Sequence, residues 1–115
     1  MTHVEITQAE RARWQRRSAA RLTEILESCQ DLPLIAWTVV PAGSLLAGHV
    51  SGLSPDAQAR RVFSAWAAAL RLGERRETVC GTGTALLHAA ADLGGVRVRL
   101  TATVFDDDQD EAATP

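Results

Sequence analysis

The sequence predicts an α+β fold, a two-layer sandwich in which an antiparallel sheet carries two helices on one face. Two stretches, residues 7–30 and 54–73, place apolar side chains at helical spacing and predict the helices. Residues 96–104 alternate strictly between apolar and polar side chains, which is typical of an antiparallel strand with one solvated face. The full element order that we expect is α-β-β-α-β-β-β.

The first helix is expected to begin at the capping box Thr7-Gln8-Ala9-Glu10 and to run to about Cys29 or Gln30. Pro33 ends it, because the residue before a proline is pushed out of the helical region. One stripe of this helix should be buried: Trp14, Ser18, Leu22, Ile25, Leu26 and Cys29.

A hairpin should follow, because residues 34–40 are rich in β-branched and aromatic side chains and residues 44–50 return after the loop Pro41-Ala42-Gly43. The second helix is expected to open at Ser54-Pro55, with serine as N-cap and proline in the first turn, and to close at Gly73. Its buried stripe should be Val62, Phe63, Trp66, Ala67 and Leu70.

Three strands complete the predicted sheet. Residues 77–80 form the first, and Gly81-Thr82-Gly83 forms a bulge or tight turn after it. Residues 84–91 form the second, although their alanine and leucine content also fits a helix. A turn at residues 92–95 leads to the last strand, residues 96–104.

Length and composition indicate a single α+β domain over residues 1–105, followed by an acidic C-terminal tail over residues 106–115. An apolar fraction of 46% with 23% charged residues is ordinary for a globular protein. We expect a cytoplasmic location, because no signal peptide, membrane span or disulfide framework is recognisable.

Three stretches resemble short uncharacterised α+β proteins of actinobacteria and their phages or mobile elements. They are Ala36-Trp37-Thr38-Val39, Ala65-Trp66-Ala67 and Gly94-Gly95-Val96-Arg97-Val98, in this order of elements. The resemblance covers most of the chain to Phe105 and implies a cellular setting, but no activity.

Residues 11–21 hold five arginines and no acid, so they carry +5 while the whole chain carries −2 and the remainder −7. Arg13, Arg16, Arg17 and Arg21 should form one exposed side of the first helix, a candidate contact site for an acidic protein, nucleic acid or this chain's own acidic tail. All twelve basic residues are arginine, which coding bias explains in part, and helical ion pairs such as Glu10–Arg13 and Arg21–Glu24 offer a purely structural alternative.

Other candidate sites are weaker. His49, His88 and Cys80 lack the closely spaced pairs of a zinc site, so we expect no metal and no cofactor. Four further arginines, Arg75, Arg76, Arg97 and Arg99, would form a basic surface if the strands that hold them were neighbours.

The sequence therefore predicts a small non-enzymatic protein-interaction module, regulatory or accessory, that acts as a homodimer with an unidentified protein partner. The alternative is a nucleic-acid-binding protein that contacts phosphates through the arginines of the first helix. The chain's pI of about 5.9 weakens this alternative, because nucleic-acid-binding domains are usually basic.

Overall fold

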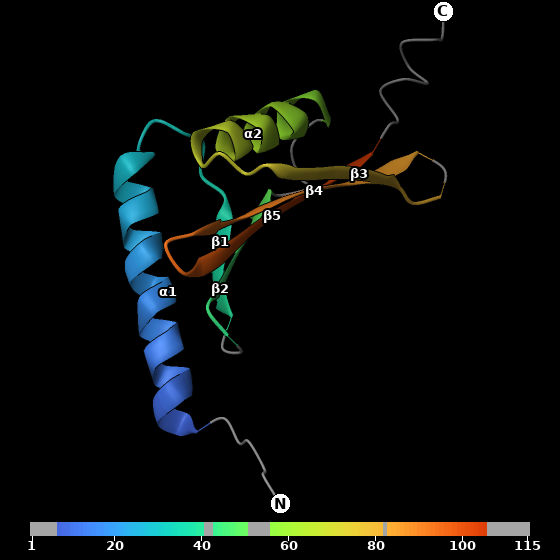
Figure 1. Ribbon diagram of the computed structural model, residues 1–115. Coiled ribbons are helices and arrows are strands. Elements are labelled where there is room, and N and C mark those ends of the chain that lie inside the picture. The colour runs from blue at the N-terminus through green and yellow to red at the C-terminus, as the bar shows by residue number, and fades with distance from the viewer. Residues whose placement is uncertain (1–6, 41–42, 51–55, 82, 106–115) are drawn as a thin grey trace, which may run out of the picture.

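Two helices lie on one side of a five-stranded sheet in the computed structural model, which describes residues 7–40, 43–50, 56–81 and 83–105 (Figure 1). The predicted α+β class and element order are both confirmed. The elements are α1 (Gln8–Ser28), β1 (Ala36–Val40), β2 (Leu45–Val50), α2 (Asp56–Ala69), β3 (Glu74–Val79), β4 (Thr84–Leu93) and β5 (Val96–Phe105).

The sheet has the strand order β1-β2-β5-β4-β3 and is mixed. Three neighbouring pairs are antiparallel as expected, but β2 and β5 run parallel. The cause is α2, which carries the chain back over the sheet from the end of β2 to the far edge. β3 therefore starts in the direction of β2, and two reversals later β5 has that direction again.

The core lies between the helices and one face of the sheet. The predicted inward side chains of β5 are all buried: Val96, Val98, Leu100, Ala102 and Val104. The predicted stripe of α2 is also buried in full: Val62, Phe63, Trp66, Ala67 and Leu70. Ile25 of α1 belongs to the same apolar cluster, so both helices cover the same face.

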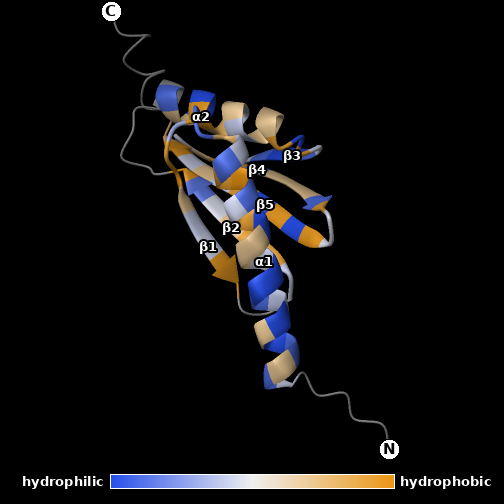
Figure 2. Cartoon of the chain, turned by 90° about the vertical axis from the view of Figure 1, so that its left-hand side faces the viewer, coloured by the Kyte–Doolittle hydropathy of each residue, from blue (hydrophilic) through white to orange (hydrophobic). Residues whose placement is uncertain are grey.

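We call the opposite side of the sheet the open face, because neither helix covers it (Figures 1 and 2). It carries the side chains that alternate with the core residues, including Thr38 of β1, His49 of β2, Arg97, Arg99 and Thr101 of β5, His88 of β4 and Arg76 of β3.

Helix α1 begins as predicted, with the side chain of Thr7 accepting a hydrogen bond from the Glu10 backbone N–H at 3.1 Å. Its C-terminal half packs on the sheet and its N-terminal half extends beyond it (Figure 2). Ser18 and Ile25 are accordingly buried, and Trp14 is half-buried. Leu26 was expected in the buried stripe but is 44% exposed.

Helix α2 does not close at Gly73 as predicted. It ends at Ala69, and the left-handed position is taken by Arg71, with φ of 55°. The Leu72 N–H donates to the Ala67 carbonyl and the Arg71 N–H to the Ala68 carbonyl, which is the Schellman arrangement. Leu72 is 2% exposed, so its burial fixes the position at which the helix stops.

Strand β3 begins at Glu74, three residues earlier than predicted, and all its residues are exposed. Its charged residues lack an apolar pattern because neither face of β3 is buried. The ambiguous segment at residues 84–91 is a strand. Gly94 and Gly95 both have positive φ, as a two-residue hairpin turn requires.

Several predicted features lie outside the described residues: Pro41-Ala42 of the first hairpin, the Ser54-Pro55 cap, Thr82 and the acidic tail. Within the described part of the chain, no helix is long and apolar enough to cross a membrane.

Candidate interaction surfaces

The arginine side of α1 divides into two parts. Arg13, Arg16 and Arg17 are exposed, and among the described residues none of them forms an ion pair. They lie on the half of α1 that extends beyond the sheet (Figure 1). The pair predicted between Glu10 and Arg13 does not form, and Glu10 contacts Thr7 instead. We define Arg13, Arg16 and Arg17 as the α1 basic side.

Arg21 is separate from the α1 basic side. Its guanidinium forms the predicted ion pair with Glu24 at 3.5 Å and lies over Gly94 in the β4–β5 turn, where no other residue type would leave room for it. Its Nε is buried without a hydrogen-bond partner. Arg21 therefore lies between α1 and the β4–β5 turn, and it is less available to a partner than the other three arginines.

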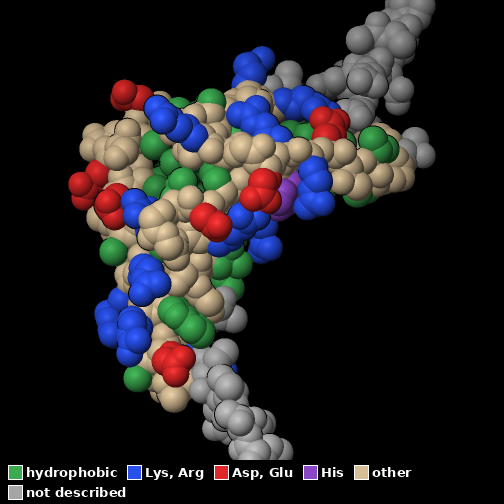
Figure 3. Space-filling model, viewed as in Figure 1, with side chains coloured by type: hydrophobic (Ala, Val, Ile, Leu, Met, Phe, Trp, Pro, Cys, Tyr) green, Lys and Arg blue, Asp and Glu red, His purple; other side chains and the backbone are tan. Residues whose placement is uncertain are grey.

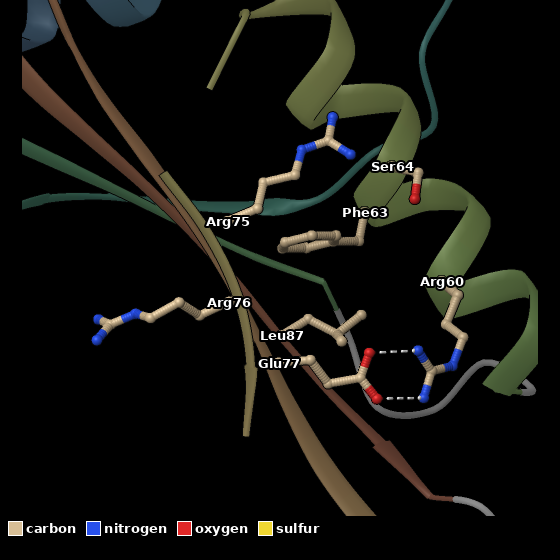
Figure 4. Close-up of a pocket in the computed structure, with 7 residues that line it drawn as sticks. All are labelled: Arg60, Phe63, Ser64, Arg75, Arg76, Glu77 and Leu87. Atoms are coloured by element: carbon tan, nitrogen blue, oxygen red, sulfur yellow. Dashed lines mark hydrogen bonds and ion pairs between the residues drawn. The ribbon is translucent and has the colours of Figure 1, made fainter. Parts of the chain in front are cut away.

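Three of the four sheet arginines share one face, although β3 and β5 are not neighbours. Strand β4 lies between these two strands. Arg76, Arg97 and Arg99 share the open face, whereas Arg75 lies on the helix side of β3 (Figure 4). The condition stated from the sequence, that the two strands be neighbours, is therefore not met, yet three of the four arginines still lie on one face.

The histidines also lie on the open face, in register with each other across the sheet. His88 is opposite Thr101, and Thr101 is opposite His49. The His49 Nδ1 and the Thr101 hydroxyl are hydrogen bonded at 3.0 Å. Cys80 is exposed beyond the end of β3. Within the part of the chain that the structure describes, no three His, Cys, Asp or Glu side chains gather as a metal site would need.

The two edges of the sheet differ in chemistry. β3 presents four charged residues in succession, Glu74 to Glu77, which is a common protection of an edge against unwanted pairing. β1, with the sequence Ala-Trp-Thr-Val-Val, carries no charge. Its outer backbone edge has no strand beside it among the described elements. β1 is therefore the edge at which another strand can be added.

An apolar hollow of about 210 Å³ lies between the end of α1 and the start of β1. Its rim exposes two large apolar side chains, Leu34 at 95% and Leu26 at 44%. Trp37 and Trp66 form its floor in an edge-to-face contact with ring centroids 5.6 Å apart. The Trp66 indole N–H donates to the Pro33 carbonyl at 2.8 Å, but the buried Trp37 Nε1 has no partner among the described residues.

A second hollow, of about 330 Å³, lies between α2 and β3 (Figure 4). Arg60 of α2 and Glu77 of β3 close one end through two parallel hydrogen bonds of 3.0 and 3.1 Å. This pairing lowers the pKa of the Glu77 carboxyl below its ordinary value. The hollow is open, and these paired charges line part of it. We therefore assign the Arg60–Glu77 pair a structural role, joining α2 to β3.

The sequence reasoning identified the α1 basic side but missed both the β1 edge and its apolar hollow. The exposure of Leu34 carries no signal in the sequence, since the residue stands in an apolar run that fits a buried strand equally well. Comparison with known proteins gives no match to any protein-family model, curated protein or solved structure.

Proposed function

We propose that this protein is a non-enzymatic interaction module that forms a homodimer by pairing β1 with β1 of a second copy. The observation that carries the proposal is the free, uncharged edge of β1 beside the exposed Leu34. Pairing would continue the sheet from one copy into the other and would satisfy the outer backbone groups of both strands. The module's cellular role would be regulatory or accessory.

The register of such a pair supports β1. A two-fold axis normal to the sheet places one residue of each strand opposite its own copy. On β1 that residue is Thr38, and threonine pairs are favourable across antiparallel strands. The same register sets Trp37 opposite Val39 of the second copy, an aromatic and β-branched pair on the helix-covered side.

The same register argument disfavours dimer formation through β3. An axis at Arg75, Arg76 or Glu77 places like charges directly opposite each other, which is destabilising. An axis at Thr78 leaves just Glu77–Val79 within the strand to pair. The burial of Leu34 and Leu26 against the second copy would add hydrophobic stabilisation, whereas β3 itself offers the exposed Val79 at its end.

Thr38→Lys tests the proposal, because Thr38 is exposed on the open face of the protomer and the substitution sets two cations at the axis. Thr78→Lys is the matched control at an exposed threonine on the opposite edge strand. We expect light scattering at micromolar concentration to show dimers for the original sequence and for Thr78→Lys, and monomers for Thr38→Lys. A monomeric original sequence, or a dimeric Thr38→Lys, would show that the proposal is wrong.

A second candidate function is nucleic-acid binding through the α1 basic side. It is favoured by three exposed arginines without ion-pair partners in the described chain, on a part of α1 that extends away from the sheet. Each phosphate that they contact would make binding weaker at higher salt. This function and the β1 dimer are compatible, because the two surfaces do not share residues.

The test is binding of DNA and RNA at two salt concentrations by the original sequence and by the variant with Arg13, Arg16 and Arg17 changed to Glu. We expect binding at low salt that the triple variant loses. Absence of binding by the original sequence at low salt removes this candidate.

A further inference from the structure

We propose that the open face holds a binding site for a phosphate group, built by Arg76 of β3, His88 of β4 and Arg99 of β5. The site lies on a face of the sheet and not at its β1 edge, so it does not depend on the proposed dimer. The space-filling view shows a histidine with basic side chains and an acidic side chain beside it, beneath these strands (Figure 3).

Strand register brings the three side chains together. Arg76 is directly opposite His88, and His88 is directly opposite Thr101. Arg99 is two residues before Thr101 on β5, so it lies diagonal to His88 on the same face. Neighbouring strands are about 4.8 Å apart, and the long side chains of the two arginines can therefore reach a common point above His88.

The charges of this face leave Arg76 and Arg99 available. Arg97 already binds both acidic neighbours, with contacts of 2.7 and 2.9 Å to Glu74 and 3.4 Å to Asp92. No ion pair joins Arg76 or Arg99 to any other described residue. Two guanidinium groups with unused donors on one face are the usual means of binding a phosphate.

His88 adds a third donor at the centre. Its ring is half-buried, and its Nδ1 is shielded from water with no hydrogen-bond partner among the described residues. A ligand cannot reach this shielded nitrogen either, so the ring nitrogen that would donate to a phosphate oxygen is Nε2. Thr101 is directly across from His88, and its hydroxyl is already hydrogen bonded to His49. We therefore do not include Thr101 in the site.

The charges that face His88 make this site sensitive to pH. Burial lowers the pKa of His88, and Arg76, Arg99 and Arg97 lower it further, whereas Glu74 opposes them. A bound phosphate would offset those cations and raise the pKa of His88. Since protonation gives the ring a positive charge, binding of a phosphate of fixed charge should strengthen as the pH falls below about 6.5, through the lowered pKa of His88.

Leu86 indicates which source of phosphate to test. It stands two residues before His88 on the same face and is 37% exposed, so it could contact an apolar group attached to a phosphate ester. Inorganic phosphate and phenyl phosphate therefore form the two arms of the experiment. Tighter binding of phenyl phosphate assigns the site to an ester, and equal binding assigns it to the free ion; both results support the site.

The measurement is the NMR signal of the His88 ring during titration with each phosphate through the millimolar range, with chloride keeping the ionic strength constant. We expect a saturable change and an increase in the pKa of His88. Arg76→Gln and Arg99→Gln should each weaken binding about threefold to tenfold. Arg61→Gln, which removes an exposed arginine of α2 in the other layer, should leave binding unchanged.

Two results would overturn the proposal. One is the absence of any saturable change at His88 with either compound. The other is undiminished binding by the doubly substituted Arg76→Gln, Arg99→Gln protein. Because both arginines are exposed or on the solvated face, the variants should keep the spectrum of the folded protein, and that spectrum is recorded first as a check.

Discussion

At the end of α2 a single residue, Arg71, adopts a backbone conformation that suits glycine. A φ of 55° costs a residue with a side chain about 1 kcal/mol, because Cβ approaches the following carbonyl. Arg71→Gly should therefore raise the free energy of unfolding by up to about 1 kcal/mol in a urea titration. Arg71→Ala keeps the strain and serves as the control, so an equal gain from both variants would contradict the explanation.

His88 should make stability depend on pH even without a ligand. The unfolded chain protonates this histidine near about pH 6.5, whereas burial and the neighbouring arginines lower its pKa in the fold. Between the two values the unfolded state binds more protons, so stability falls as the pH falls through about 6.5 and levels off below the folded pKa.

Thermal unfolding at a series of pH values measures this effect. His88→Asn should flatten the profile in this window, and His49→Asn, on the same face, should retain it. An unchanged slope in His88→Asn would assign the pH dependence to other groups.

Among the elements, the β1–β2 hairpin depends on the absence of a side chain at Gly48. Trp37 lies directly opposite, and its ring carbons are 3.0 and 3.1 Å from the place where a Cβ would stand, with Leu100 Cδ1 at 3.2 Å. Gly48→Ala would therefore force the Trp37 ring, which packs against Trp66, to shift by a few tenths of an ångström. We expect a loss of about 1–3 kcal/mol in stability, measured by urea unfolding.

Gly73→Ala is the matched control for this substitution. Gly73 has no atom within 4 Å of the added Cβ and no positive φ, so the change should be neutral or slightly stabilising. A similar loss at both glycines would show that Trp37 is not the cause.

The sequence predicts those elements whose pattern reports burial. Val96, Val98 and Leu100 alternate with arginines because one face of β5 is covered and the other solvated, and this alternation can be recognised in the sequence. The start of β3 cannot be predicted from the sequence, because a charged strand with no buried face has no apolar pattern. The parallel pairing of β2 and β5 depends on where α2 delivers the chain, which local sequence does not encode.

The candidate sites follow the same rule. Exposure of Arg13, Arg16 and Arg17 was predictable from helical spacing. The role of Arg21 was not, since the turn that it contacts at Gly94 is more than seventy residues away in the chain. Pairing of Arg97 with Glu74 likewise required the strand order, which decides which arginines of the open face remain available.

At the scale of the whole molecule, the surfaces divide by chemistry. The α1 basic side lies at one end, the open face carries the sheet arginines and histidines, and the uncharged β1 edge lies beside an apolar hollow. The β3 edge is charged and the β1 edge is uncharged, so another strand would be added to the sheet more readily at β1 than at β3. Two copies that pair through β1 would leave both β3 edges outward and charged, so growth would stop at the dimer.

The proposed dimer would make the midpoint of thermal unfolding depend on protein concentration, since unfolding would then also separate the copies. A chain of 115 residues has an unfolding enthalpy of about 80 kcal/mol, or about 160 kcal/mol for two. A tenfold increase in concentration should therefore raise the midpoint by about 3 °C. Thr38→Lys should abolish this dependence and Thr78→Lys should retain it, as calorimetry at three concentrations would measure. A midpoint of the original sequence that does not move with concentration would mean that folding and association are not linked, contrary to pairing through β1.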